Sequence, residues 1–307
     1  MQMLLGEVSR GFGRYYDALG HFDLALTSFR NLHSDEGCAW TLRDIGTVNE
    51  ALGHHSKALA DYEEALRLFN ALGVRSGQAW VLVGQSVVYT DQGKLDLAEQ
   101  TCSNAITLFR EQSMRRGEGW ALRVMGDIAR QHRNFGMARG YYQEAQAIFI
   151  SLGDRVDQAQ VINSLGAIAF DEQELFDARE HYEHALAIAQ EQGSRQIEGR
   201  ALRGLGDVAR GMRRFDEAEH HYHDAFSIAT DLDTPAERCA TLRRLGELYA
   251  VQDRYRDTLD CWVHALALDL RLGHPARKEQ QDKVDAVVAE HHLEEVYPEL
   301  CNKYGLG

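Results

Sequence analysis

The amino-acid sequence predicts an all-α protein, an α-solenoid of about seven helix-turn-helix repeats of 40 residues that wind into a right-handed superhelix. Three observations support this prediction. Small and aromatic residues recur every 40 positions along most of the 307 residues. Within a repeat, the apolar residues have the spacing of one helix face. Glycine-containing turns separate the predicted helices.

The 40-residue period is clearest in a frame of small and aromatic positions. In the second repeat, Gly46 is followed twelve residues later by Ala58. Tyr62 and Ala65 come next in the same frame. One of the seven repeats with this frame has Cys102 at the aromatic position. The other six repeats have an aromatic ring there: Phe22, Tyr62, Tyr142, Tyr182, Tyr222 and Trp262. The small residues allow helices to approach closely, and the ring fills the space between them.

Each repeat is expected to contain two antiparallel helices. One predicted helix, which carries Gly46, covers about residues 37–52 and ends at Gly53. The second helix follows from the spacing of Ala58, Tyr62 and Ala65, which places them on one face. The same pattern divides the chain into repeats at 2–41, 42–81, 82–121, 122–161, 162–201, 202–241 and 242–281, and residues 282–307 are expected to form a capping helix and a tail.

Composition excludes several classes of protein. No apolar run reaches the roughly 18 residues of a membrane span. The five cysteines are scattered without a CxxC pair, which favours reduced thiols in the cytoplasm over a disulfide framework or a zinc ribbon. The net charge of −14 disfavours direct binding of nucleic acid.

Motifs of catalysis and of nucleotide binding are absent from the sequence, so we expect no enzyme and no cofactor. Histidines at 181, 184, 220, 221 and 223 form the one suggestive cluster. Adjacent second helices could place His181 near His221, but a solvated outer face explains the cluster better than a metal site in a chain with 14 histidines.

One stripe of the first helices points away from the packing frame and is predicted to line a concave groove. At 100° per residue, Trp40 and Arg43 lie on this stripe, opposite Gly46. The candidate binding residues are the aromatic and polar members of the stripe: Trp40, Arg43, Trp80, Trp120, Arg123, Arg130, Asn163, Arg200, Arg203, Arg210 and Arg243. The stripe is aromatic toward the N-terminus and rich in arginine toward the C-terminus.

Two interpretations remain open for each part of this stripe. The tryptophans recur at a spacing of 40, so they either seal one repeat against the next or receive apolar side chains of a ligand. The arginines either pair locally or bind a carboxylate or phosphate through the planar guanidinium fork. Only three acids share the stripe with six of the arginines (Asp127, Asp207 and Glu247), so we predict an excess of about three positive charges there. Asn163 is expected to bond the backbone of an extended peptide.

The frame of Gly46, Ala58, Tyr62 and Ala65 resembles the tetratricopeptide repeat, whose usual period is 34 residues. The linker Gly153-Asp154-Arg155 resembles that of 40-residue versions in two groups of proteins. One is the C-terminal sensor region of bacterial multidomain transcription regulators and signalling NTPases, including the antibiotic regulatory proteins of actinomycetes. The other is the animal adaptors that orient the mitotic spindle. The resemblance covers about residues 2–281.

The resemblance implies a protein-binding module, and the stripe suggests what it binds. The leading hypothesis is a non-enzymatic regulatory region of a bacterial transcription regulator that binds an acidic, partly apolar peptide or partner domain, including domains upstream of this chain in a longer protein. An intracellular receptor for a small molecule or signalling peptide is the second hypothesis. A structural scaffold, as a homodimer, is the third.

Overall fold

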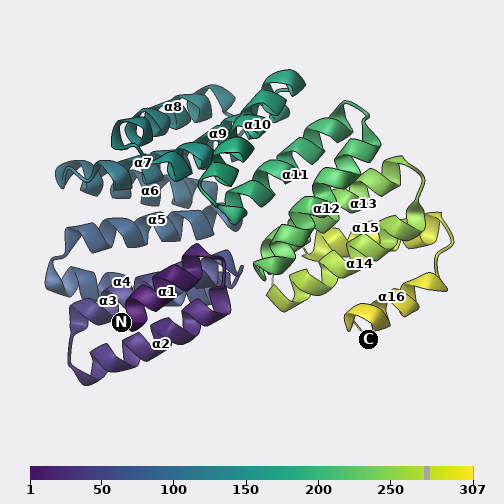
Figure 1. The fold of residues 1–307 in the computed structure, drawn as a ribbon. Helices are drawn as coiled ribbons and strands as arrows, with labels where there is room; N and C mark the ends of the chain where they lie inside the picture. The colour runs from purple at the N-terminus through teal and green to yellow at the C-terminus, as the bar shows by residue number, and fades with distance from the viewer. Residues whose placement is uncertain (273–276, 307) are drawn as a thin grey trace. The chain divides into compact units, whose positions relative to one another are not determined.

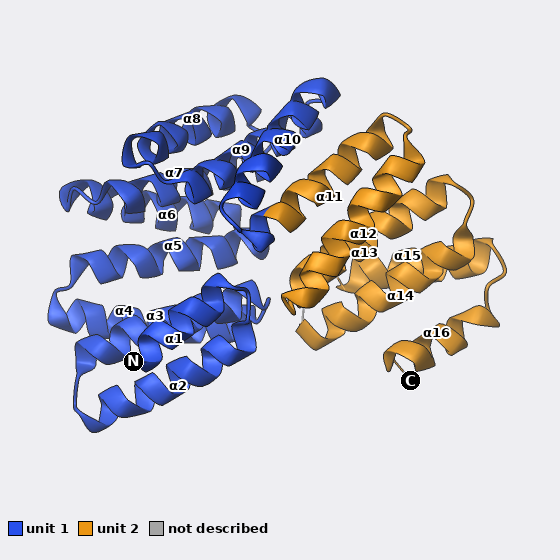
Figure 2. Ribbon diagram, in the orientation of Figure 1, with its two compact units in different colours: residues 1–197 blue, residues 198–307 orange. Residues whose placement is uncertain are grey.

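The computed structural model describes residues 1–272 and 277–306, and every regular element among them is an α-helix (Figure 1). Consecutive helices pair as antiparallel hairpins that stack on one another, as the sequence predicts. The predicted fold class, an all-α solenoid, is therefore confirmed. The helices group into two compact units, residues 1–197 and 198–307 (Figure 2).

Unit 1 holds five helix hairpins. The first helices of its hairpins are α1 (Gln2–Gly11), α3 (Asp35–Ala51), α5 (Arg75–Asp91), α7 (Arg115–Gln131) and α9 (Arg155–Asp171). The second helices are α2 (Tyr15–Asn31), α4 (His55–Leu72), α6 (Leu95–Glu111), α8 (Phe135–Leu152) and α10 (Leu175–Glu191). Among these first helices, α3 contacts α5, α5 contacts α7, and α7 contacts α9.

Unit 2 contains most of α11 (Arg195–Gly211), followed by α12 (Phe215–Asp231), α13 (Pro235–Val251) and α14 (Tyr255–Leu272). Two shorter helices follow, α15 (Arg277–Glu290) and α16 (Val296–Tyr304). Pro235 is the first residue of α13, a position where the missing backbone N–H of proline costs nothing.

The aromatic frame residues explain why the hairpins stack so closely. Tyr62 is fully buried between α3 and α5. A Cβ atom at Gly46 would lie 2.7 Å from the Tyr62 ring, and one at Gly84 would lie 2.3 Å from its Cζ. These contacts are too short for any side chain larger than hydrogen, so glycine at both positions lets the ring insert between two first helices.

Local sequence signals set where the helices begin and how they turn. The side chains of Ser34, Asn134 and Asp154 accept hydrogen bonds from backbone N–H groups in the first turns of α3, α8 and α9. The turn after α3 passes through Gly53 with φ of 78°, where glycine avoids a steric penalty.

The C-terminal segment differs from the expected helix and tail, because it folds into two helices. Leu300 of α16 is buried in a cluster with Val284 of α15 and Leu259 of α14. The Tyr304 ring of α16 stacks on His264 of α14 with centroids 4.3 Å apart. The apolar pattern of α16 spans only about two turns, which is too short to stand out in the sequence.

Candidate functional site

The tryptophans of the predicted stripe occupy the same position on three consecutive first helices of unit 1, and all three are half-buried. Trp40 packs edge-on against Phe69 of α4, with ring centroids 4.9 Å apart. Trp80 packs in the same way against Phe109 of α6 at 5.0 Å. Both tryptophans therefore pack against the second helix of their own hairpin and keep part of the indole exposed. Contact of these rings with a ligand stays a prediction.

Trp120 is also tied to the next hairpin. Its Nε1 donates a hydrogen bond to Oδ2 of Asp157 on α9 over 2.8 Å. Asp157 also accepts from Arg116, at 3.2 Å from Nη2. Burial raises the pKa of the Asp157 carboxyl, and the Trp120 and Arg116 contacts oppose that rise.

Two arginines of unit 1 lie over the indole rings one turn away. The Arg43 guanidinium lies 5.2 Å from the centroid of Trp40, and that of Arg123 lies 5.1 Å from the centroid of Trp120. Arg123 also pairs with Asp127 at 2.7 Å. A cation over an indole face is held in place by the ring quadrupole. The side chains therefore form a preorganised, mixed aromatic and cationic surface.

The remaining two predicted residues of unit 1 differ in whether their polar side chains have partners. Arg130 of α7 pairs with Asp171 at the end of α9 over 2.7 Å. Asn163 lies at the middle of α9, and its Oδ1 is buried without a hydrogen-bond partner among the described residues. An unsatisfied buried carbonyl costs roughly 1–3 kcal/mol.

In unit 2, two stripe arginines converge on a single carboxylate. Arg200 and Arg203 of α11 both donate to Glu237 of α13, Arg200 from Nε over 2.7 Å. Burial alone would raise the pKa of the Glu237 carboxyl, but Arg203 and Arg200 outweigh that effect and hold the pKa well below its ordinary value. Glu237 is therefore ionised and clamped at neutral pH.

The other two arginines of unit 2 are also paired. Arg210 Nη2 lies 3.2 Å from Glu247 on α13. Arg243 Nη2 lies 2.5 Å from Asp269 on α14, a carboxylate that is almost fully buried. Unit 2 thus presents arginines whose guanidinium groups are fixed by carboxylates of the neighbouring helix.

The expected excess of positive charge on the stripe is not found. Three acids that the sequence analysis did not assign to it, Asp171, Glu237 and Asp269, each take an arginine from another helix. Asp171 lies 41 residues after its partner Arg130, and Glu237 lies 37 residues after its partner Arg200. A search of the sequence for opposite charges separated by about one 40-residue repeat could have found these two pairs. Counting acids along a single helix face could not find them.

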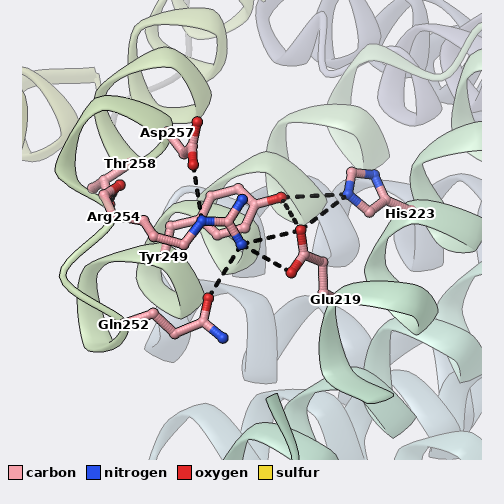
Figure 3. Close-up of polar contacts among 7 residues, drawn as sticks. All are labelled: Glu219, His223, Tyr249, Gln252, Arg254, Asp257 and Thr258. Carbon is pink, nitrogen blue, oxygen red and sulfur yellow. Dashed lines mark hydrogen bonds and ion pairs between the residues drawn. The ribbon is translucent and has the colours of Figure 1, made fainter. Parts of the chain in front are cut away.

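A polar cluster outside the stripe joins α12, α13 and α14 (Figure 3). Glu219 accepts hydrogen bonds from the Tyr249 hydroxyl at 2.9 Å and from Arg254 at 3.0 Å. His223 Nε2 lies 3.3 Å from the same hydroxyl. The cluster is internally satisfied and links three helices, and no group of three or more potential metal ligands occurs among the described residues.

Comparison with known proteins gives the following matches. The tetratricopeptide repeat family model matches residues 1–71, 77–151 and 157–231. No curated protein matches the sequence. Among the described parts of the chain, no helix has the length and apolar character needed to cross a membrane.

Solved structures share the fold at low sequence identity. A Rap protein in complex with Competence and Sporulation Factor has a TM-score of 0.76 at 15% identity, covering 91% of this chain and 75% of that one. The Rap conjugation gene regulator of plasmid pLS20, in complex with the Phr peptide, has a TM-score of 0.71 at 13% identity, covering 94% and 74%. BtubC from P. vanneervenii has a TM-score of 0.54 at 21% identity, covering 70% and 91%.

Proposed function

Because the chain belongs to the tetratricopeptide repeat family, we propose that it is a non-enzymatic module that binds a peptide or protein segment on its first-helix stripe. The proposal rests on the partial burial that all the stripe residues share. All eleven stripe residues, from Trp40 to Arg243, are half-buried, and every one except Asn163 is held by ring packing, a hydrogen bond or an ion pair. Such preorganised side chains lose little conformational entropy on binding.

The chemistry of the stripe fits an acidic, partly apolar ligand. In unit 1, the exposed parts of Trp40, Trp80 and Trp120 offer apolar contact area, and tryptophan is enriched among residues that dominate binding energies. Asn163 is half-buried on α9, and its side-chain amide is the group proposed to bond the backbone of the ligand.

In unit 2, carboxylates of the ligand bind arginines that are already oriented. The Arg203 side chain is 23% exposed while paired with Glu237, so its guanidinium group can also bind a carboxylate of the ligand. The internal acids lower the affinity for the ligand, but they hold the guanidinium groups in position.

The solved structures support a peptide as the ligand class. Two Rap proteins with this fold are complexes, one with Competence and Sporulation Factor and one with the Phr peptide. The linker Gly153-Asp154-Arg155 supports a role in a bacterial cytoplasmic transcription regulator, whose upstream domains would be natural binding partners.

The proposal is tested by charge reversal on the stripe. The wild-type chain is used to capture partners from a lysate, and the captured peptide or protein is then titrated against purified variants. Arg203→Glu should weaken binding at least about tenfold, because it removes a charge-assisted donor and adds a repelling carboxylate. The matched control is Arg67→Glu on α4, whose side chain is 74% exposed. It should change the dissociation constant less than about twofold. Wild-type affinity in Arg203→Glu would mean that the arginines only hold the hairpins together.

A further inference from the structure

The series of first helices continues onto α15. The Trp262 ring of α14 lies against α13, because a Cβ atom at Gly246 would be 2.2 Å from its Nε1. The same ring belongs to one buried cluster with Val284 of α15. In unit 1, the Tyr62 ring of α4 makes the equivalent contacts with α3 and α5. In unit 2, α15 therefore takes the place of a first helix next to α13.

This placement puts a cation at the same repeat position on three successive first helices of unit 2. Arg203 lies on α11, Arg243 on α13 and Lys283 on α15. The ion pair of Arg203 with Glu237 joins α11 to α13. Lys283, by a hydrogen bond, and Arg243, by its charge, both lower the pKa of the Glu279 carboxyl on α15. The three cations therefore form a row across the unit, and Lys283 is a member that the stripe did not include.

The cations of this row are more accessible than the acids beneath them. The Arg243 side chain is 26% exposed, whereas its partner Asp269 is 1% exposed. Lys283 is 43% exposed and lies 2.9 Å from Glu279, one turn away on the same helix. Surface pairs of this kind contribute little to stability, so a ligand carboxylate can replace Glu279 at small cost. The row therefore offers positive charge at the surface of an acidic protein.

Resting on the binding function proposed above, we propose that unit 2 binds a segment in the polyproline II conformation with a carboxylate at every third residue. Packed helices lie about 8–10 Å apart, which sets the spacing of the row. A polyproline II segment has three residues per turn and rises about 3.1 Å per residue, so every third side chain points the same way, about 9 Å from the last. In a β-strand, side chains on one face are about 7 Å apart, which fits the row less well.

Two synthetic peptides of identical composition test the spacing. Each contains three aspartates and four prolines with blocked ends, because proline favours the polyproline II conformation. One has aspartate at its first, fourth and seventh positions, and the other at its first, third and fifth. Fluorescence anisotropy should give the first peptide a dissociation constant at least about fivefold lower, because only its carboxylates can meet all three cations at once. Equal affinities, or binding of neither peptide, would overturn the proposal.

Lys283 tests the row from the side of the protein. Lys283→Glu should raise the dissociation constant of the first peptide at least about fivefold, because it replaces an attracting charge with a repelling one. Lys278→Glu is the matched control, since Lys278 is an exposed lysine of the same helix on a different face. It should change the dissociation constant less than about twofold. Equal effects of the two variants would mean that only the overall charge matters, which contradicts the proposal.

A neutral variant guards against a change in the helix itself. Lys283→Glu places two glutamates one turn apart on α15, and like charges at this spacing weaken a helix. Lys283→Gln avoids this repulsion and still removes the positive charge. It should also weaken binding of the first peptide, by a smaller factor than Lys283→Glu. Wild-type affinity in Lys283→Gln would overturn the role of Lys283.

The captured ligand separates this proposal from the binding function on which it rests. The expected result is weaker binding of that ligand in both Arg203→Glu and Lys283→Glu, with no change in Lys278→Glu. If only Arg203→Glu weakens binding, the stripe binds the ligand without α15, and this proposal alone fails. If the captured ligand keeps wild-type affinity in Arg203→Glu and Lys283→Glu, the proposed function of the arginines fails as well.

Discussion

At the scale of the residue, the fold depends on glycines whose missing side chains leave room for a neighbouring aromatic ring. A Cβ atom on Gly126 would lie 2.4 Å from Cε1 of Tyr142, whose ring is fully buried and whose hydroxyl donates to Asp127 over 2.6 Å. The ring is held at both ends and cannot move aside. The small-residue frame in the sequence is therefore explained by direct contact with the aromatic position of the same repeat.

Gly126→Ala should accordingly destabilise the protein by roughly 1–3 kcal/mol, as expected for a side chain forced into a packed core. The control is Gly140→Ala on α8, where nothing lies within 4 Å of the added methyl group. That change should stabilise the protein by about 0.5–1 kcal/mol, because alanine loses less backbone entropy in a helix. Urea denaturation of both variants measures the difference, and losses of equal size would contradict the packing described here.

The Glu237 clamp gives the stability a defined pH dependence. The two arginines hold the pKa of Glu237 below its ordinary value, so the pair stabilises the folded state above that ordinary value, near pH 4.3, and the stabilisation is lost as the pH falls further. At pH 7, Glu237→Gln should cost about 2 kcal/mol. The difference between variant and wild type should shrink at pH 3.

Urea denaturation at the two pH values measures this effect. Glu144→Gln is the control, because Glu144 is 60% exposed and lies 4.0 Å from Arg110. It should change the stability little at either pH. A difference between Glu237→Gln and wild type that stays constant from pH 7 to pH 3 would show that Glu237 contributes no charge pairing.

At the scale of the element, hairpin stacking is the main source of stability, and it could be predicted almost entirely. The frame at Gly46, Ala58 and Tyr62 fixes which faces meet, and its 40-residue period repeats that contact along the chain. The partners of the arginines could not be predicted in the same way. Glu237 and Asp269 lie on different helices from Arg200 and Arg243, so pairing them required the register between helices and not the pattern of one helix.

Stacking predicts that an aromatic residue in the middle of a unit matters more than one at its edge. Tyr142→Ala removes a ring with hairpins on both sides and should cost about 3–5 kcal/mol. Phe22→Ala affects the first hairpin, which has a neighbouring hairpin on one side only among the described residues, and it should cost less. Denaturation midpoints with unchanged m values test this comparison, and equal losses would argue against nearest-neighbour stacking.

At the scale of the whole molecule, the division into two units has no counterpart in the sequence pattern, because the 40-residue period continues across residues 197 and 198 without an insertion. The net charge of −14 does not indicate the local charge of the stripe. Each of its six arginines from Arg123 to Arg243 has a carboxylate partner. The proposed recognition of an acidic ligand therefore requires that these internal pairs exchange or share their arginines.

The proposed binding function of the stripe is tested most directly by titrating the captured ligand against Glu237→Gln and Arg203→Glu by calorimetry. If ligand carboxylates bind the unit-2 arginines, Glu237→Gln removes the internal competitor and should tighten binding about tenfold, about 1.4 kcal/mol, whereas Arg203→Glu should weaken it by at least as much. Opposite shifts of the two variants, both reduced at high salt, are the predicted result. Wild-type affinity in both variants would contradict the account and leave the arginines with a purely structural role.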